Sequence, residues 1–253
     1  MEKYLIREIT KDEAVEFIHA YHYSKILPRL TKHYLGFFGE DGLIGVVTLG
    51  WGTQPKQTIK KILYQDNVTT EDYFEIGKMC FSPSLNNNHY TGSHIMSLLV
   101  KWMKKNTEAN YLYTLADGIM GKVGYVYQAS NFKYLGSFKT TVYRDKKTGE
   151  KIHPRSAKKL CIENAEWENK KKVFWLTHEF MEYKGLEKIN GLMYRYILPL
   201  NKKARKALNK YPSLEYPKDE DLAFYKRVDK GKFIEIEKPN FNMNVFEYNY
   251  QRY

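Results

Sequence analysis

The chain has 253 residues, of which 43% are hydrophobic, enough for one large domain or for a core domain with an extension. No apolar run is long enough to cross a bilayer, and the first residues, MEKYLIREIT, lack the apolar stretch of a signal peptide. The two cysteines lack the Cys-x-x-Cys spacing of a metal site, which indicates free thiols in a reducing compartment. These features exclude a membrane-spanning class and favour a cytoplasmic protein.

The charge is strongly basic and unevenly distributed. The net charge is +12; residues 133–159 hold nine Lys or Arg against Asp145 and Glu150, and residues 201–210 hold five with no acid. Aromatic residues make up 15% of the chain, and aromatic faces among basic residues can stack on unpaired bases. This combination favours a nucleic-acid partner. Solvated lysines without a partner are the alternative.

Strands and helices alternate along the chain. The capping box Thr10-Lys11-Asp12-Glu13 predicts a helix start, and Gly39-Glu40-Asp41-Gly42 predicts a hairpin turn. The first half predicts strands at 4–8, 34–38, 43–49 and 74–81 and helices at 10–19 and 91–105, separated by a mixed connection at 51–70. The second half predicts strands at 111–116, 132–143 and 192–198, helices at 121–130 and 202–210, and a loose tail.

This order is typical of an α/β fold with a mixed central sheet flanked by helices. We expect a core at residues 1–160 and a basic C-terminal extension at residues 161–253, packed on the core or continuing it.

Three short stretches carry candidate chemistry. YHYSK, residues 21–25, follows the first helix with side chains that donate, accept or move a proton, although His22 also fits a plain helix C-terminus. Asp117 ends a buried-type strand, where α/β sheets place ligand sites, although Asp-Gly is also a common turn pair. The loop before Gly92 and Ser93 leads into a helix, as anion sites do, although a simple turn is the more common case. No metal-ligand spacing is present.

The run EIGKMCFSPSLNNNHYTGSHIMSLLVKW, with YLYTLAD and VYQASNFKYLG after it, resembles the central half of the GNAT acyltransferase fold. The resemblance implies a GNAT-like sheet, an acetyl-CoA or related acyl donor, and a leaving-group role for Tyr127. The family's loop pattern is Arg or Gln, two residues, Gly, one residue, and Gly or Ala. Here the basic residue and the first glycine are missing, which leaves CoA binding open. The implied cofactor-binding residues are Asn88, His89, Tyr90, Thr91, Gly92 and Ser93.

A narrower family matches more of the chain. YHYSKILPR, YLGFFGEDGLIGVVTLG, EIGKMCFSP, LADGIMGKVGYVYQASNFKYLGS, KIHPRS and MYRYILPLNKKARKALNK resemble the Mom-like DNA modification proteins of bacteriophages, over about residues 15 to 218. That resemblance implies addition of a carbamoylmethyl group to the N6 amine of adenine in DNA, protecting phage DNA from restriction. Both a CoA thioester and iron have been considered for the family's chemistry, and the sequence leaves the metal unknown.

This reading gives roles to individual residues. Because the adenine amine is a poor nucleophile, the reaction needs a proton acceptor, for which His22 is the candidate. The expected catalytic residues are His22, Tyr23, Ser24, Tyr34, Asp117 and Tyr127. Phosphate contacts are expected from Lys25, Arg29, Lys139, Arg144, Lys146, Lys147, Lys151, Arg155, Lys158 and Lys159. An N6 amine inside a duplex is paired, so the base is expected to be flipped out or read from a single strand.

Two alternatives stay open. One is an acetyl-CoA-dependent N-acetyltransferase acting on a protein or a small amine. The other is a catalytically inactive DNA-binding module that kept the fold. The sequence also leaves open the DNA target motif and whether the protein forms a homodimer.

Overall fold

The computed structural model describes residues 4–40, 42–52, 54–62, 67–83, 91–154, 157–229 and 231–244. The chain forms two compact units. Unit 1 comprises Met1–Ala116, Gly124–Gly136 and Arg195–Tyr216, and unit 2 comprises Asp117–Val123, Ser137–Tyr194 and Pro217–Tyr253. Each unit is assembled from segments far apart in the sequence. The expected boundary at residue 160, between a core and a basic C-terminal extension packed on it or continuing it, stays a prediction.

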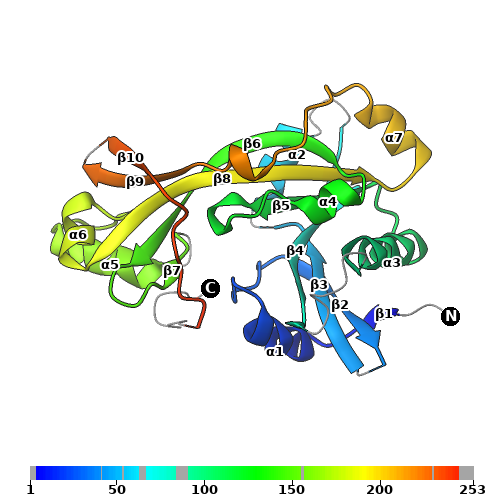
Figure 1. The fold of residues 1–253 in the computed structure, drawn as a ribbon, viewed down its shortest axis with the longest axis horizontal. Coiled ribbons are helices and arrows are strands. Elements are labelled where there is room, and N and C mark those ends of the chain that lie inside the picture. Colours follow the sequence, from blue (N-terminus) through cyan, green and yellow to red (C-terminus); the bar gives the residue numbers. More distant parts are fainter. Residues whose placement is uncertain are drawn as a thin grey trace. The chain divides into compact units, whose positions relative to one another are not determined.

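Unit 1 is built on a mixed sheet with strand order β1-β2-β3-β4-β5, continued by β8 and β6 (Figure 1). Strands β1 to β4 pair antiparallel, and β4 pairs parallel with β5. The predicted mixed sheet flanked by helices is therefore confirmed. The elements are β1 (Leu5–Glu8), α1 (Lys11–Tyr21), β2 (Thr31–Gly39), β3 (Gly42–Gly50), α2 (Pro55–Ile62), β4 (Tyr73–Phe81), α3 (Thr91–Asn106), β5 (Tyr111–Asp117), α4 (Tyr125–Ala129) and α7 (Lys202–Leu208).

Helices α1 and α3 lie on opposite sides of strands β1 to β4 (Figure 1). Thr10 caps α1 through the expected capping box, with its hydroxyl accepting from the Glu13 N–H at 3.2 Å. One face of α1 is buried against the sheet because Phe17 and Ile18 pack in a cluster with Val46 of β3 and Cys80 of β4. Local sequence therefore fixes where α1 begins, and its apolar side chains fix which face of the sheet it covers, called here the α1 face.

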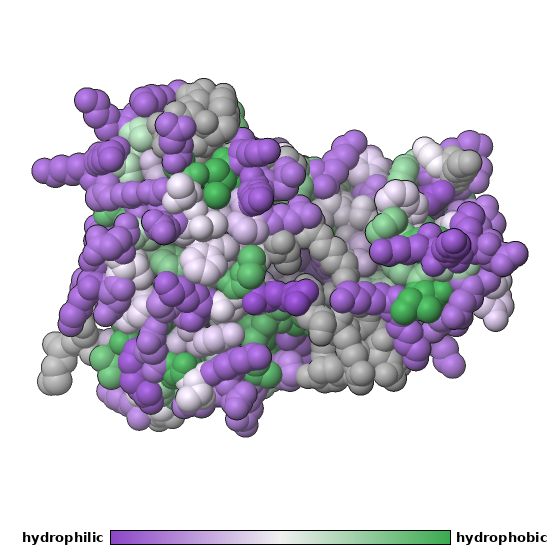
Figure 2. Space-filling view, turned by 180° about the vertical axis from the view of Figure 1, so that it is seen from behind, coloured by the Kyte–Doolittle hydropathy of each residue, from purple (hydrophilic) through white to green (hydrophobic). Residues whose placement is uncertain are grey.

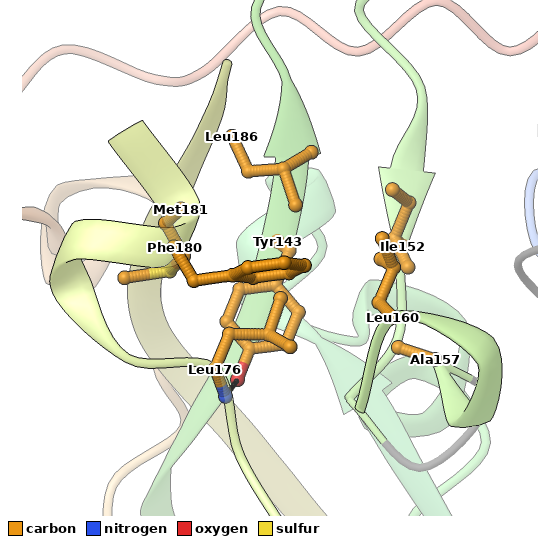
Figure 3. Close-up of a cluster of buried hydrophobic side chains, with 8 residues drawn as sticks. All are labelled: Tyr143, Ile152, Ala157, Leu160, Leu176, Phe180, Met181 and Leu186. Atoms are coloured by element: carbon orange, nitrogen blue, oxygen red, sulfur yellow. Dashed lines mark hydrogen bonds between the residues drawn. The ribbon is translucent and has the colours of Figure 1, made fainter. Parts of the chain in front are cut away.

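Unit 2 contains the remaining elements and its own core. β6 (Lys133–Asp145) and β8 (Leu186–Pro199) run through both units, and the elements of unit 2 alone are β7 (Lys151–Ile152), α5 (Lys158–Trp167), α6 (His178–Tyr183), β9 (Phe224–Asp229) and β10 (Lys232–Ile236). Figure 3 shows a cluster of this core, in which side chains from α5 and α6 surround Tyr143. The Tyr143 hydroxyl accepts a hydrogen bond from the Leu176 N–H at 3.2 Å, so the buried phenol is satisfied.

Three expectations differ from the structure. The connection at 51–70 contains helix α2, and the tail expected to be loose contains the hairpin β9–β10. The helix expected at 121–130 is shorter, Tyr125–Ala129, because Gly121 and Gly124 adopt left-handed backbone angles, with φ of +71° and +95°.

The surface is mainly polar. Hydrophilic side chains predominate on the face seen in Figure 2, with smaller hydrophobic patches among them. This agrees with the mean hydropathy of −0.61. Among the described residues, no helix has the length and apolar content needed to span a membrane.

Candidate functional site

A row of polar side chains crosses three strands on the α1 face of unit 1. Tyr34 of β2 pairs with Thr48 of β3, and Thr48 pairs with Lys78 of β4. Directly paired residues point to the same face of a sheet, so these three side chains form one row. Burial raises the pKa of the Tyr34 phenol, which therefore stays protonated at neutral pH.

The YHYSK segment is held against this row. His22 caps the C-terminus of α1, with its N–H donating to the Ile18 carbonyl at 2.9 Å, and its side chain is buried. The Ser24 N–H donates to His22 Nδ1 at 2.8 Å, and the Ser24 Oγ accepts from Lys78 Nζ at 2.7 Å. Tyr23 stacks on the His22 ring, with centroids 4.4 Å apart. His22, Tyr23 and Ser24 thus contact one another and Lys78, and their expected catalytic roles stay predictions.

The hydrogen bond at Nδ1 decides what His22 can do. A neutral imidazole whose Nδ1 accepts a hydrogen bond carries its proton on Nε2. In this arrangement the ring offers a donor at Nε2, and its acceptor is already used by the Ser24 backbone. The geometry therefore favours a hydrogen-bond donor at His22 over the proton acceptor that the sequence suggests.

Lys78 is a site residue that the sequence reasoning missed. Its side chain is 8% exposed, and its own N–H donates to the Thr48 hydroxyl at 2.9 Å. Lysine is rarely buried without a polar partner, and here the ammonium group reaches Ser24. The available signal was two charged residues, Glu75 and Lys78, in the otherwise apolar strand FEIGKMCF.

Glu75, also missed, lies on the same face of β4. Lys78 pairs with Thr48, and Glu75 pairs with Gly50. Between these two pairs the register of β3 and β4 shifts by one residue, so three steps along β4 match two steps along β3. This bulge places side chains three residues apart on one face, where regular alternation would separate them. Burial raises the pKa of Glu75 to about 7, and no hydrogen bond joins its carboxyl group to another described residue. A carboxyl group with this pKa is suited to accept or donate a proton at neutral pH.

The β4–β5 ladder is short. The paired residues run only from Tyr73 with Tyr111 to Glu75 with Tyr113, although both strands continue beyond them. Glu75 therefore lies where the two strands stop pairing. Gly52 approaches the Glu75 carboxyl group so closely that a Cβ at this position would overlap it. A glycine is thus required beside the candidate proton acceptor.

Tyr127 of α4 packs on the other face of β5. It contacts Phe132 and Tyr196, with ring centroids 5.4 and 5.6 Å away, and lies beside Ala116, whose side chain points away from the face that carries Tyr113. Burial raises the pKa of the Tyr127 phenol, which fits a proton donor and also fits a core residue. Its expected leaving-group role stays a prediction.

Asp117 belongs to unit 2. Its Oδ2 accepts from Lys151 Nζ at 2.6 Å and its Oδ1 accepts from the Ile119 N–H at 3.1 Å. The structure therefore pairs the expected acid with an expected phosphate contact, a link that sequence spacing did not reveal. The expected role of Asp117 as a proton acceptor stays a prediction.

The expected cofactor loop is only partly described. Asn88, His89 and Tyr90 lie outside the described residues, Thr91 is the first residue of α3, and Ser93 is partly buried in its first turn. A Cβ on Gly92 would lie 2.9 Å from Val126 Cγ2 of α4. Packing of α3 on α4 is therefore sufficient to explain the glycine, and the expected cofactor-binding role of this segment stays a prediction.

Within the described ranges, no set of side chains has the arrangement of an iron site. No group of three or more His, Cys, Asp or Glu side chains is arranged there to hold a metal ion.

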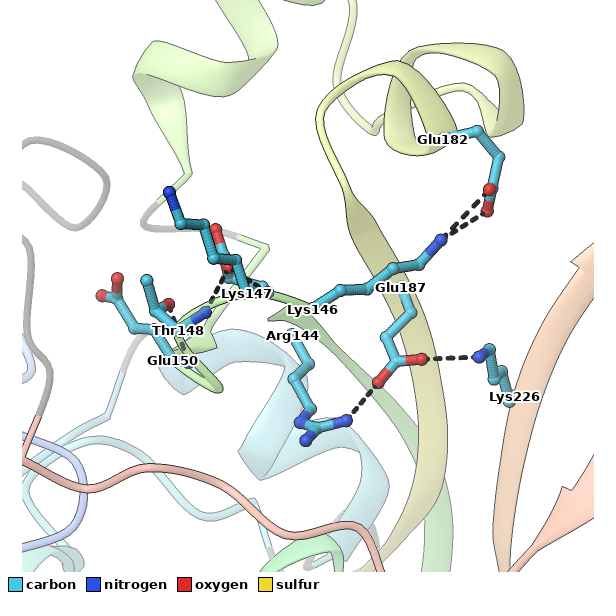
Figure 4. A network of polar contacts seen from close by, with 9 residues as sticks. Arg144, Lys146, Lys147, Thr148, Glu150, Glu182, Glu187 and Lys226 are labelled. Carbon is cyan, nitrogen blue, oxygen red and sulfur yellow. Dashed lines mark hydrogen bonds and ion pairs between the residues drawn. The ribbon is translucent and has the colours of Figure 1, made fainter.

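Several expected phosphate contacts are exposed and others are paired. Figure 4 shows that Glu187 joins Arg144 at 2.6 Å and Lys226 at 2.7 Å, and that Lys146 reaches Glu182 at 3.1 Å. Burial alone would raise the pKa of Glu187, but the hydrogen bonds from Lys226 and Arg144 hold it below its ordinary value. Lys25 is partly buried, Arg155 lies outside the described residues, and the exposed members are Arg29, Lys139, Lys146, Lys147, Lys158 and Lys159.

Comparison with known proteins identifies relatives. The model of the Mom protein family matches residues 3–218. The methylcarbamoylase Mom of Escherichia phage Mu is 29% identical over 191 residues, which cover 74% of this chain and 72% of that protein.

Solved structures with similar folds are acetyltransferases. Spermidine N-acetyltransferase from Vibrio cholerae, in complex with CoA and spermine, is 12% identical with a TM-score of 0.38, and the match covers 55% of this chain and 85% of that chain. An acetyltransferase from Bacillus subtilis in complex with CoA is 13% identical with a TM-score of 0.39, over 79% and 99% of the two chains. Because the family model matches most of the sequence, this chain belongs to the Mom protein family.

Proposed function

We propose that this protein is a transferase that adds a carbamoylmethyl-type group to the N6 amine of adenine in DNA and so protects phage DNA from restriction. The family match over residues 3–218 carries this proposal. The name of the phage Mu relative, a methylcarbamoylase, supports transfer of such a group. The net charge of +12 supports a polyanionic substrate.

The polar row on the α1 face supplies groups for this reaction. The adenine N6 lone pair is delocalised into the ring, so the amine must lose a proton as its nitrogen attacks. The Glu75 carboxylate, with a pKa of about 7, accepts that proton. The new bond joins N6 to the methylene carbon of the donor, and the bond from that carbon to its leaving group breaks with its electron pair.

Ser24, Lys78 and His22 position the transferred group. Lys78 donates to Ser24 Oγ, so the hydroxyl hydrogen of Ser24 remains available for an acceptor. That hydrogen is a donor suited to the carbonyl oxygen of a carbamoyl group, and His22 holds the Ser24 backbone in place through Nδ1. The Lys78 ammonium group, through its hydrogen bond to Ser24, holds the hydroxyl in position to bind that oxygen.

We specify the donor only by its chemical class, as an activated carbamoylmethyl compound. Acetyl-CoA or a related acyl donor, and iron, were both considered from the family resemblance; the loop expected to bind the CoA pyrophosphate lies mostly outside the described residues, and among the described residues no group of His, Cys, Asp or Glu is arranged to hold a metal ion. On the DNA side, the adenine must leave the duplex stack to expose its amine, and stacking on Tyr23 is a suitable way to receive it.

The test is nucleoside mass spectrometry of plasmid DNA from cells that express the wild type, Lys78→Met or Glu75→Gln. We expect a new adenosine species, heavier by a carbamoylmethyl group, with the wild type and with the control Lys232→Met, whose side chain is exposed in unit 2. Both site variants should lose it.

Other outcomes contradict the proposal in different ways. If the wild type is soluble and binds DNA but leaves the adenosine unmodified, the result would support a catalytically inactive DNA-binding module. An acetylated amine outside DNA would support an N-acetyltransferase. Full modification by Lys78→Met and Glu75→Gln would place the active site elsewhere.

A further inference from the structure

Exposed aromatic side chains gather at helices α5 and α6 of unit 2. The two helices pack together through Leu160, Phe180 and Met181, and Figure 1 shows them side by side. An aromatic side chain left in water forgoes the free energy of burial, so a group of them indicates a surface that a partner covers. The aromatic patch, whose members are 48% to 68% exposed, consists of Trp167 at the end of α5, Phe174 and Trp175 in the following loop, and Tyr183 at the end of α6.

The loop between α5 and α6 is closed by Glu168. Its carboxylate accepts a hydrogen bond from the Thr177 hydroxyl at 2.8 Å and another from the Lys170 ammonium group at 2.9 Å. Both ends of the loop therefore meet at one residue. Trp167 directly precedes Glu168, and Trp175 lies two residues before Thr177. The closure thus keeps aromatic side chains from both ends of the loop in the same part of unit 2.

A buried neighbour anchors the exposed pair Phe174 and Trp175. Leu176 follows them, and its side chain is buried in the cluster that contains Tyr143. The Leu176 N–H donates to the Tyr143 hydroxyl at 3.2 Å. The two exposed rings therefore stand on a fixed backbone, and a partner that contacts them loses little affinity to ordering of the loop.

Lysines surround the aromatic patch. The loop carries consecutive exposed lysines at positions 170–172. Lys172 Nζ lies 4.8 Å from the centroid of the Phe174 ring, and Lys184 Nζ lies 5.8 Å from that of Tyr183. Protein–protein interfaces are depleted of lysine, whereas surfaces for unpaired nucleotides combine aromatic rings for the bases with cations for the phosphates. The composition of this surface favours a nucleic-acid strand.

The loop keeps a positive charge after its acid is counted. Residues 168–177 contain three lysines and one acid, Glu168, which gives +2. On the flanking helices, Glu163 pairs with Lys184 at 2.7 Å and Glu182 pairs with Lys146 at 3.1 Å. A polyanion with exposed bases therefore complements both the charge of the loop and its rings.

We propose that the aromatic patch binds unpaired bases of single-stranded DNA by stacking, while the lysines at positions 170–172 contact its phosphates. Such binding tolerates different sequences because every base has a π-face. The choice of DNA rests on the proposed function, whereas the stacking chemistry does not. A second copy of this chain is the other occupant that the test distinguishes.

The test compares a single-stranded oligonucleotide with a duplex of the same sequence. Each is fluorescently labelled and titrated with the full chain at several salt concentrations, and binding is followed by anisotropy. For Phe174→Ala with Trp175→Ala, we expect single-strand binding to weaken on the order of 10- to 100-fold, with an unchanged slope of log K against log salt. Duplex binding should stay close to that of the wild type, because paired bases already stack on one another. Both side chains are exposed, so the urea midpoint should not change.

Three further variants separate stacking from charge and from general exposure. The matched control Tyr225→Ala with Phe233→Ala, which removes two other exposed aromatic rings from unit 2, should bind like the wild type. Phe174→Tyr with Trp175→Phe should keep most of the affinity, because the rings remain. Lys171→Gln with Lys172→Gln should instead make the salt slope for the single strand less steep by about 0.7 to 1.4.

Several results would overturn the proposal. Wild-type single-strand affinity in Phe174→Ala with Trp175→Ala would do so, and a wild-type dimer that this variant turns into a monomer in sedimentation velocity would assign the patch to an interface between copies. Equal weakening on the duplex, or in the matched control, would remove the specific role in stacking. Tighter binding of the wild type to RNA of the same sequence would overturn the assignment to DNA.

The binding test is independent of the reaction. A wild type that modifies no adenosine but shows the expected loss of single-strand binding would overturn only the proposed reaction. A wild type that modifies adenosine, together with a variant that binds single strands normally, would overturn only this surface.

Discussion

Glu75 gives the sharpest prediction, because burial changes both its proton affinity and the stability of the fold. Its pKa rises from 4.5 to about 7 on folding. The folded chain therefore holds a proton between these pH values that the unfolded chain has lost. Since each pKa unit corresponds to ~1.4 kcal/mol, the ionised carboxylate lowers the free energy of unfolding by about 3 kcal/mol above pH 7, and by almost nothing below pH 4.5.

The perturbation is Glu75→Gln, which keeps the shape and cannot ionise. We expect the variant and the wild type to have similar free energies of unfolding near pH 4.5. As the pH rises to 7 the wild type loses stability relative to the variant, and at pH 8 the variant should be more stable by about 3 kcal/mol. Urea unfolding followed by tryptophan fluorescence measures this difference, and Glu71→Gln, at an exposed position, is the control. The variant should also lose the adenosine modification.

A difference between Glu75→Gln and the wild type that stays constant from pH 5 to 8 would refute the reasoning, because a group with an ordinary pKa gives no such dependence. A more stable variant without activity would separate catalysis from folding, since loss of structure could not explain the loss of reaction.

Other predictions concern packing and thiol chemistry. Gly92→Ala should lower the free energy of unfolding by ~1–3 kcal/mol because of its contact with Val126, and Val126→Ala should restore most of it; lost activity at unchanged stability would instead assign the glycine to a ligand. Burial raises the pKa of the Cys80 thiol to about 12, so Cys80 should resist iodoacetamide at pH 8 until urea is added. Rapid labelling of the native protein would contradict this prediction. Tyr143→Phe should cost ~1–3 kcal/mol, read from the urea midpoint, because the buried Leu176 N–H loses its acceptor; an unchanged midpoint would show that water replaces it.

Local sequence was sufficient for much of unit 1. The capping box at Thr10, the hairpin turn after Gly39 and the apolar stripe of α3 each act within a few residues, so their patterns predicted the elements correctly. YHYSK was likewise recognisable as a candidate site because its side chains are adjacent in the chain. The motifs of the Mom-like family were also legible without a structure, and the family match confirms them.

Tertiary structure decided which of these groups meet and what they can do. The register shift in β4 places Glu75 and Lys78 on one face, and regular alternation along the strand gave no sign of it. Asp117 meets Lys151 from 34 residues away. The proton affinity of Glu75 depends on burial by elements distant in sequence. The amino-acid sequence by itself determined the family, the element types and the local caps, because those depend on neighbouring residues; the pairing of charges and the pKa values depend on long-range packing and appear only in the folded chain.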